Sequence, residues 1–102
     1  MGTVAELAHP NAVEYNGILY LTGYRDGAQH LKRSADGGRT WLRFGDGSEE
    51  SLIGAPSDDE RAGLLKMDSQ GRRLLAAVPN WPVIDIYLSV DDGETWTKES
   101  SV

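Results

Sequence analysis

Cysteine is absent from this sequence of 102 residues, and histidine occurs only twice, at His9 and His30. Without cysteine the chain forms neither disulfides nor thiolate metal sites, and its redox compartment stays open. Two histidines are too few for a histidine-rich metal site, and the Asp-x-Asp-x-Asp-Gly spacing of a calcium loop is missing as well. We therefore expect no bound metal and no cofactor.

Long apolar runs and an excess of positive charge are also missing. No stretch approaches the roughly 20 apolar residues that span a bilayer, and the N-terminus lacks the basic and apolar regions of a secretion signal. The net charge of −6 argues against binding to a phosphate backbone. These absences predict a soluble, complete chain without nucleic-acid or membrane partners.

A turn-like motif that occurs twice is the clearest positive feature. Residues 34–41 and 89–96 both read Ser-x-Asp-x-Gly-x-Thr-Trp, and their serines lie 55 positions apart (89 − 34). Five fixed positions out of eight, found twice in a short chain, indicate an internal repeat. A repeat of about this period is typical of propellers and solenoids.

The motif resembles the Asp-box, or BNR repeat, of sialidase-like β-propellers. The resemblance implies a turn between the third and fourth strands of a blade, at its rim and away from any substrate site. Asp and Ser suit hydrogen bonds inside a tight turn, Gly suits a positive φ, and Trp supplies a large apolar surface. These structural positions are Ser34, Asp36, Gly38, Thr40, Trp41, Ser89, Asp91, Gly93, Thr95 and Trp96.

Around the two turns the sequence predicts an all-β chain with two four-stranded antiparallel propeller blades. The expected strands are short apolar-rich segments bounded by Gly, Asn, Asp or Pro turns: 10–15, 18–24, 28–34, 40–44, 64–68, 72–78, 83–89 and 95–99. We expect a single module over residues 1–102. Blade one covers about 9–45 and blade two about 61–102, and the loop between them, about 46–60, contains six acids and no base.

Two blades cannot close a ring, because propellers close with roughly four to eight blades. A repeat unit cannot bury its faces alone, so each end of the pair would expose apolar surface. We therefore predict a homo-oligomer, with a trimer giving a six-bladed propeller. Six is also the blade number that the resemblance implies. A tetramer with eight blades and a stack with partner subunits are the alternatives.

The loops opposite the Asp-box turns are where a propeller would carry a ligand site. Candidate ligand-binding residues in those loops are Tyr24, Arg25, Asp26, Asn80 and Trp81. Trp81 lies between Asn and Pro in a predicted turn, which favours partial exposure. Its ring would serve as a stacking platform for a sugar or an anchor for a protein partner, or it would pack against the neighbouring blade.

Catalysis is not expected. As the resemblance implies, a sialidase needs an arginine triad, a Tyr–Glu nucleophile pair and an acid–base Asp, and the Arg-Ile-Pro motif of that family is missing here. Arg25 is accompanied by many acids, whose field would repel an anionic sugar. We assign no catalytic residues.

The function predicted is therefore a non-enzymatic, self-assembling module with a structural or interaction role. By analogy with propellers in phage tails, a virion component in the tail, neck or capsid is one such role, and we expect a cytoplasmic or virion-associated location. Other virion proteins or a glycan are the further partners considered. A carbohydrate-binding, lectin-like propeller is the alternative, and a sialidase-like glycoside hydrolase is the third possibility.

Overall fold

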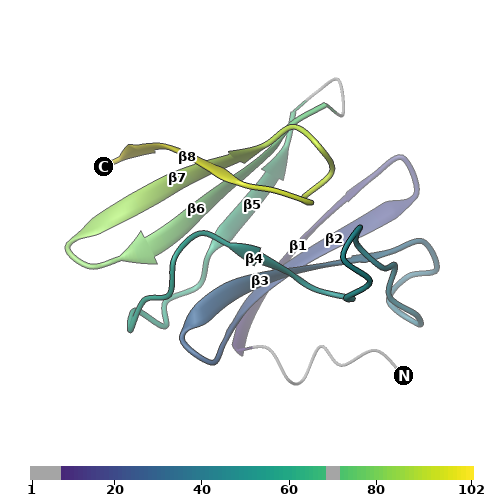
Figure 1. Ribbon diagram of the computed structural model, residues 1–102, viewed down its shortest axis with the longest axis horizontal. Helices are drawn as coiled ribbons and strands as arrows, with labels where there is room; N and C mark the ends of the chain where they lie inside the picture. Colours follow the sequence, from purple (N-terminus) through teal and green to yellow (C-terminus); the bar gives the residue numbers. More distant parts are fainter. Residues whose placement is uncertain (1–7, 69–71) are drawn as a thin grey trace.

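The computed structural model describes residues 8–68 and 72–102, and this part of the chain is all-β and contains no helix. The strands are β1 (Ala8–Tyr15), β2 (Ile18–Arg25), β3 (Ala28–Ser34), β4 (Ser51–Ile53), β5 (Leu64–Met67), β6 (Leu74–Asn80), β7 (Val83–Ser89) and β8 (Thr97–Ser101). They form two four-stranded antiparallel sheets, each with its strands in chain order. The two predicted four-stranded sheets are thus confirmed (Figure 1).

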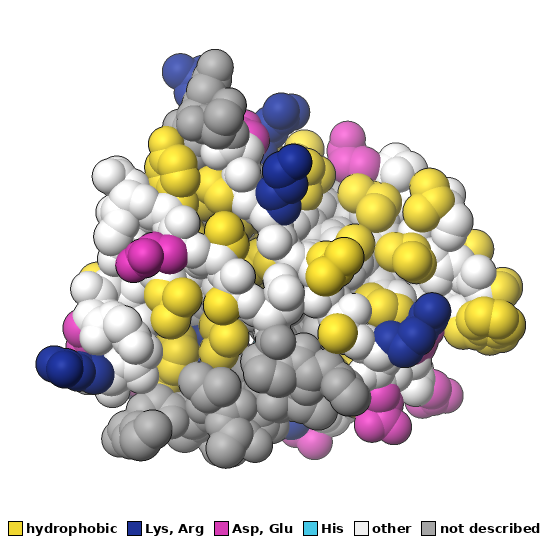
Figure 2. Space-filling model, turned by 180° about the vertical axis from the view of Figure 1, so that it is seen from behind, with side chains coloured by type: hydrophobic (Ala, Val, Ile, Leu, Met, Phe, Trp, Pro, Cys, Tyr) yellow, Lys and Arg dark blue, Asp and Glu magenta, His cyan; other side chains and the backbone are white. Residues whose placement is uncertain are grey.

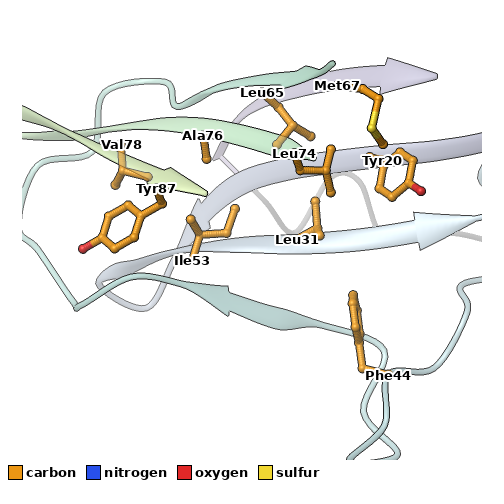
Figure 3. Close-up of a cluster of buried hydrophobic side chains, with 10 residues drawn as sticks. All are labelled: Tyr20, Leu31, Phe44, Ile53, Leu65, Met67, Leu74, Ala76, Val78 and Tyr87. Carbon is orange, nitrogen blue, oxygen red and sulfur yellow. The ribbon is translucent and has the colours of Figure 1, made fainter. Parts of the chain in front are cut away.

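Sheet one (β1–β4) and sheet two (β5–β8) pack against each other through one face each, which we call their inner faces. Buried side chains from both sheets meet there in a single apolar cluster, drawn in Figure 3. Leu31 of β3 and Ile53 of β4 are fully buried, and so, to within one per cent, is Leu74 of β6. The core of the chain is therefore the space between the two sheets.

Strand β7 has an unusual distribution of burial. Its apolar side chains Ile84, Ile86 and Leu88 are only partly buried, whereas the alternate residues Asp85, Tyr87 and Ser89 are buried. Asp85 is stabilised on the buried side by the hydroxyl of Ser101, which donates to its Oδ1 at 2.6 Å. The more apolar face of β7 is thus the outer face of sheet two, the reverse of an ordinary two-layer protein.

The predicted fourth strand over 40–44 is wrong. Leu42 N donates to Arg33 O of β3 at 2.7 Å, but Phe44 N turns away and donates to Ser48 O. The strand forms later, at Ser51–Ile53, inside the predicted acidic loop. The reason is that the connection from the third to the fourth strand is longer in sheet one than in sheet two. Leu31 pairs with Ser51, 20 positions later, whereas Ile86 in sheet two pairs with Ser100, 14 positions later.

The two repeated turns have nearly the same hydrogen bonds. In the first, Ser34 Oγ donates to Asp36 Oδ1 (2.7 Å) and accepts from Gly38 N (2.9 Å), and Thr40 Oγ1 donates to Asp36 Oδ2 (2.6 Å). The corresponding distances in the second turn are 2.8, 2.8 and 2.6 Å, between Ser89, Asp91, Gly93 and Thr95. The bonds from the Thr40 hydroxyl and amide hold the pKa of Asp36 well below its usual range.

Gly93 is the position where a turn of sheet two touches sheet one. Its φ is +87°, and a Cβ built on it would lie 2.1 Å from Leu31 Cδ2 and 3.6 Å from Leu74 Cδ1. Glycine is therefore required at this position for two reasons: the backbone has a positive φ, and Leu31 leaves no room for a Cβ.

We predict that Gly93→Ala destabilises the fold more than Gly17→Ala does. Gly17 also has a positive φ, +84°, but a Cβ there would meet no described atom within 4 Å. The Gly17 variant should cost about 1–2 kcal/mol of unfolding free energy from the left-handed backbone alone. Overpacking against Leu31 should add about 1–3 kcal/mol in the Gly93 variant. Equal losses in urea titrations of the two variants would contradict this account.

Candidate functional site

The structure places the five predicted ligand-binding residues in two different groups. Asn80 and Trp81 lie at the turn between β6 and β7, beside the segment 57–61. Arg25 and Asp26 lie at the turn between β2 and β3 and are ion-paired to each other at 3.6 Å. The hydroxyl of Tyr24 donates to Ser57 O at 2.8 Å, so Tyr24 supports the segment next to Trp81.

The Trp81 group lines an open cleft of about 580 Å³. Its walls are Ser57, Asp58, Asp59, Glu60, Arg61, Asn80 and Trp81. Asn80 is the last residue of β6, although the sequence predicted it in a loop, and the turn itself consists of Trp81 and Pro82. The rigid hairpin of β6 and β7 therefore holds one side of the cleft.

Asp59 ties the two sides of the cleft together. Its Oδ2 accepts from Trp81 N at 2.8 Å and from the guanidinium of Arg61 at 2.7 Å, and its Oδ1 accepts from Arg61 N at 3.1 Å. The side chain of Asp59 is only 9% exposed. The Arg61 hydrogen bonds, with help from the two backbone amides, hold the pKa of Asp59 well below its usual range despite partial burial.

Asn80 is held by a second set of bonds. Its Oδ1 accepts from Ser57 Oγ at 3.1 Å, and its Nδ2 donates to Asp85 Oδ2 at 3.0 Å. Ser57 Oγ in turn accepts from Asp59 N at 3.1 Å. The polar wall of the cleft is thus positioned before any ligand arrives.

Trp81 is the most exposed aromatic surface of the cleft, with 77% of its area open to solvent. The Arg61 guanidinium lies 5.9 Å from the centre of its ring, within the range of a cation–π contact. A flat ring beside fixed carboxylate, amide and guanidinium groups can stack on a ligand ring and hydrogen-bond its edge. Ser57, the one hydroxyl side chain among these lining residues, donates to the amide oxygen of Asn80.

Arg25 takes part in a separate ionic cluster on sheet one. Its Nη1 donates to Glu50 Oε2 at 2.8 Å, with a second bond from Nη2 to Oε1, and Glu50 also meets His30 (3.3 Å) and Lys32 (3.5 Å). Burial raises the pKa of Glu50, but the hydrogen bonds and charge of Arg25, together with the charge of Lys32, outweigh it and lower the pKa overall. Glu50 therefore already neutralises the positive charge of Arg25 that an anionic ligand would need.

Comparison of the chain with protein-family models, with curated proteins and with solved structures finds no match. The likeness of the two turns to Asp-boxes therefore stays a prediction from their residues and hydrogen bonds.

Neither a metal-binding cluster of side chains nor a membrane-spanning helix is found among the described residues. Over 8–68 and 72–102, no group of three or more His, Asp or Glu side chains is placed to hold a metal ion. No helix in the same ranges is long and apolar enough to cross a membrane.

Sequence reasoning missed Asp59, Arg61 and Glu50 as structured groups. All three fall in or beside the segment that was predicted to be a solvated acidic loop. Asp59 bonds to Trp81 across 22 residues and Glu50 to Arg25 across 25, whereas Arg61 bonds to Asp59 only two residues away. No local spacing signals the two long-range contacts, because tertiary packing alone brings those partners together.

We predict that the bond between Asp59 and Trp81 N–H survives acidification. A lowered folded-state pKa means that the bond's contribution is present above the ordinary Asp pKa of about 4 and is lost only well below it. The Trp81 amide resonance should therefore hold its position between about pH 7 and about pH 4. In Asp59→Asn the resonance should move, while Asp58→Asn, at the exposed neighbouring acid, should leave it in place. A wild-type midpoint near the ordinary Asp value would overturn this assignment.

Proposed function

We propose that this chain is a non-enzymatic structural module whose function is to assemble with copies of itself into a closed β-propeller. The observation that carries the proposal is the outer face of sheet two, where the apolar side of β7 remains partly exposed. Leu64 of β5, at 61% exposed, and Val102, at 75%, extend this surface. A large contiguous apolar surface on a soluble domain marks an interaction site.

The space-filling view supports the same interpretation. In Figure 2 hydrophobic side chains gather over the part of the molecule where sheet two lies. A groove of about 570 Å³ runs through this region and is lined by Leu64, Leu75, Ala77 and Ile86 together with residues of β1. Charged residues that usually protect an exposed sheet face are few here, since Lys66 is the one charged side chain among the described residues that line the groove.

The ring size follows from counting sheets. If each sheet is one blade, three copies give six blades and four copies give eight, and both numbers lie in the range in which propellers close. We favour the trimer because six blades match the sialidase-like fold that the repeated turns resemble. A symmetric ring of this kind suits a structural position in a larger particle, such as a phage tail, neck or capsid attachment.

We predict a native mass of about 33 kDa in solution, three times the chain mass of 11.1 kDa. Light scattering coupled to size-exclusion chromatography measures this mass directly. A mass near 44 kDa, four times the chain mass, would favour the eight-bladed ring. A single species at the chain mass, even at high protein concentration, would overturn self-assembly.

A second candidate function is glycan binding at the Trp81 cleft. The specific observation in its favour is an exposed indole beside Arg61 and the fixed polar groups of Asp59 and Asn80. In this function the Trp81 ring would stack on the apolar face of a sugar, and the polar wall would bind its hydroxyls.

We predict that glycans retained on an array by the wild-type protein lose most of their signal with Trp81→Ala. Val90→Ala, at another exposed apolar side chain (70% exposed), is the matched control and should bind as the wild type does. Retention of no glycan, or equal binding by both variants, would remove this second candidate and leave the structural role in place.

A further inference from the structure

Because the two sheets are repeats of one unit, each residue at their inner interface has an equivalent residue on an outer face. A second copy of the chain could use these equivalent residues to make the same contacts. Positions related by 55 residues occupy the same place in each sheet: Leu19 pairs with Ser34 as Leu74 pairs with Ser89. The same shift relates Leu31 to Ile86, Gly38 to Gly93 and Leu19 to Leu74. In position, each sheet therefore has one face equivalent to the inner face of sheet one and one equivalent to the inner face of sheet two, although some residues differ: Lys32 on the outer face of sheet one corresponds to Tyr87.

At the centre of the inner interface, Leu31 of sheet one fits against Gly93 and Leu74 of sheet two. Leu31 is fully buried there, and its Cδ2 lies where a Cβ of residue 93 would stand. Close packing of this kind requires a small residue opposite a large one.

At the equivalent place on the outer face of sheet one, Leu19 and Trp41 are the only described residues near the glycine. A Cβ built on Gly38, which also has a positive φ (+94°), would lie 3.8 Å from Leu19 Cδ2 and 3.8 Å from the Trp41 ring. No other described atom beyond its chain neighbours comes within 4 Å, so no described side chain takes the position that Leu31 takes at Gly93. The counterpart of Leu31, Ile86, lines the apolar groove on the outer face of sheet two.

Two hydrogen bonds across the inner interface also have equivalent positions on the outer faces. Ser51 Oγ donates to Gly93 O at 2.6 Å, and Asn11 Oδ1 accepts from Leu65 N at 3.0 Å. The residue equivalent to Ser51 is Ser100, because it pairs with Ile86 as Ser51 pairs with Leu31. Ser100 is exposed.

The Asn11 contact maps onto a pair of exposed residues. Thr22 and Ala77 are equivalent positions, and they pair with Asn11 and Leu64 respectively, so Leu64 is the counterpart of Asn11. The next residues along these strands, Ala12 and Leu65, are counterparts for the same reason. Leu64 and Ala12 are both exposed in the single chain.

We infer that the outer face of sheet two of one copy packs on the outer face of sheet one of the next, in the register of the inner interface. Ile86 then fills the space beside Gly38 and Leu19, Ser100 Oγ donates to Gly38 O, and Leu64 lies beside Ala12. This inference rests on the self-assembly proposed above and specifies its partner surfaces. Because the two surfaces differ, the contact is head-to-tail and can close a ring.

The test uses one arginine on each surface and then mixes the variants. Ile86→Arg removes the sheet-two surface but leaves the sheet-one surface intact, and Leu19→Arg does the reverse. Each variant alone should weaken self-association at least about 100-fold, because a charge is buried in an apolar contact. An equimolar mixture should form a pair of about 22 kDa, twice 11.1 kDa, through the one intact contact.

Folding of the variants is controlled in two ways. Circular dichroism melts identify a variant that fails to fold, and the exposed pair Leu64→Arg and Ala12→Arg repeats the complementation at positions where a single chain tolerates charge. Val90→Arg, at an exposed apolar residue that does not line the groove, should assemble like the wild type.

The outcomes separate the two proposals. A wild-type oligomer whose folded variants fail to complement, or which is disrupted only by the sheet-two substitutions, overturns the head-to-tail register while self-assembly stands. The second of these results would indicate symmetric pairing of two sheet-two surfaces. A wild-type monomer overturns both.

A substitution at Gly38 tests the proposed contact between Gly38 and Ile86 by adding a methyl group to it. Gly38→Ala should weaken assembly by crowding Ile86 of the preceding copy, as Gly93→Ala crowds Leu31 within the chain. Gly37→Ala is the matched control, because Gly37 also has a positive φ (+75°) and a Cβ there would meet no described atom within 4 Å. Equal assembly of the two folded variants would contradict the placement of Ile86 at Gly38.

Discussion

The contact of Leu31 with Gly93 and Leu74 is the constraint on which the rest of the structure depends. A fully buried leucine from sheet one occupies the space that any Cβ at residue 93 would need. The second repeated turn must therefore keep its glycine, and Ser89, buried beneath it, fixes the turn by accepting from Gly93 N. Close packing at this point sets how near the two sheets approach.

In a chain of two repeat units, each sheet has only one face covered by the other sheet. The inner faces bury Leu31, Ile53 and Leu74. Ile86 is the equivalent of Leu31, and Val102 is the equivalent of Ile53, because it pairs with Ile84 as Ile53 pairs with Gln29; both remain on the outer side of sheet two. That inequality between equivalent positions explains why β7 buries its polar side and exposes its apolar side. It is also the physical reason for proposing that other copies complete the structure.

Much of the fold could be predicted, and little of the candidate site. Alternating apolar residues and Gly turns located β2, β3 and β7 closely, because such signals are local. The fourth strand of sheet one was misplaced, since residues 40–44 have a strand-like composition but form no ladder with β3: the backbone bond from Leu42 to Arg33 is not continued at Phe44, whose N–H bonds to Ser48. Trp81 was expected at an exposed turn, whereas its fixation by Asp59 and the pairing of Arg25 with Glu50 join residues more than 20 positions apart.

The sequence by itself determined the all-β class, the two repeated turns and the number of units, because strand alternation and turn chemistry depend on neighbours along the chain. Only the tertiary structure decided where β4 begins, which acids are buried and paired, and which side of each sheet is covered. Those features depend on which surfaces meet in space. An alternating strand such as β7 has two faces, and its sequence cannot tell which one another sheet will cover.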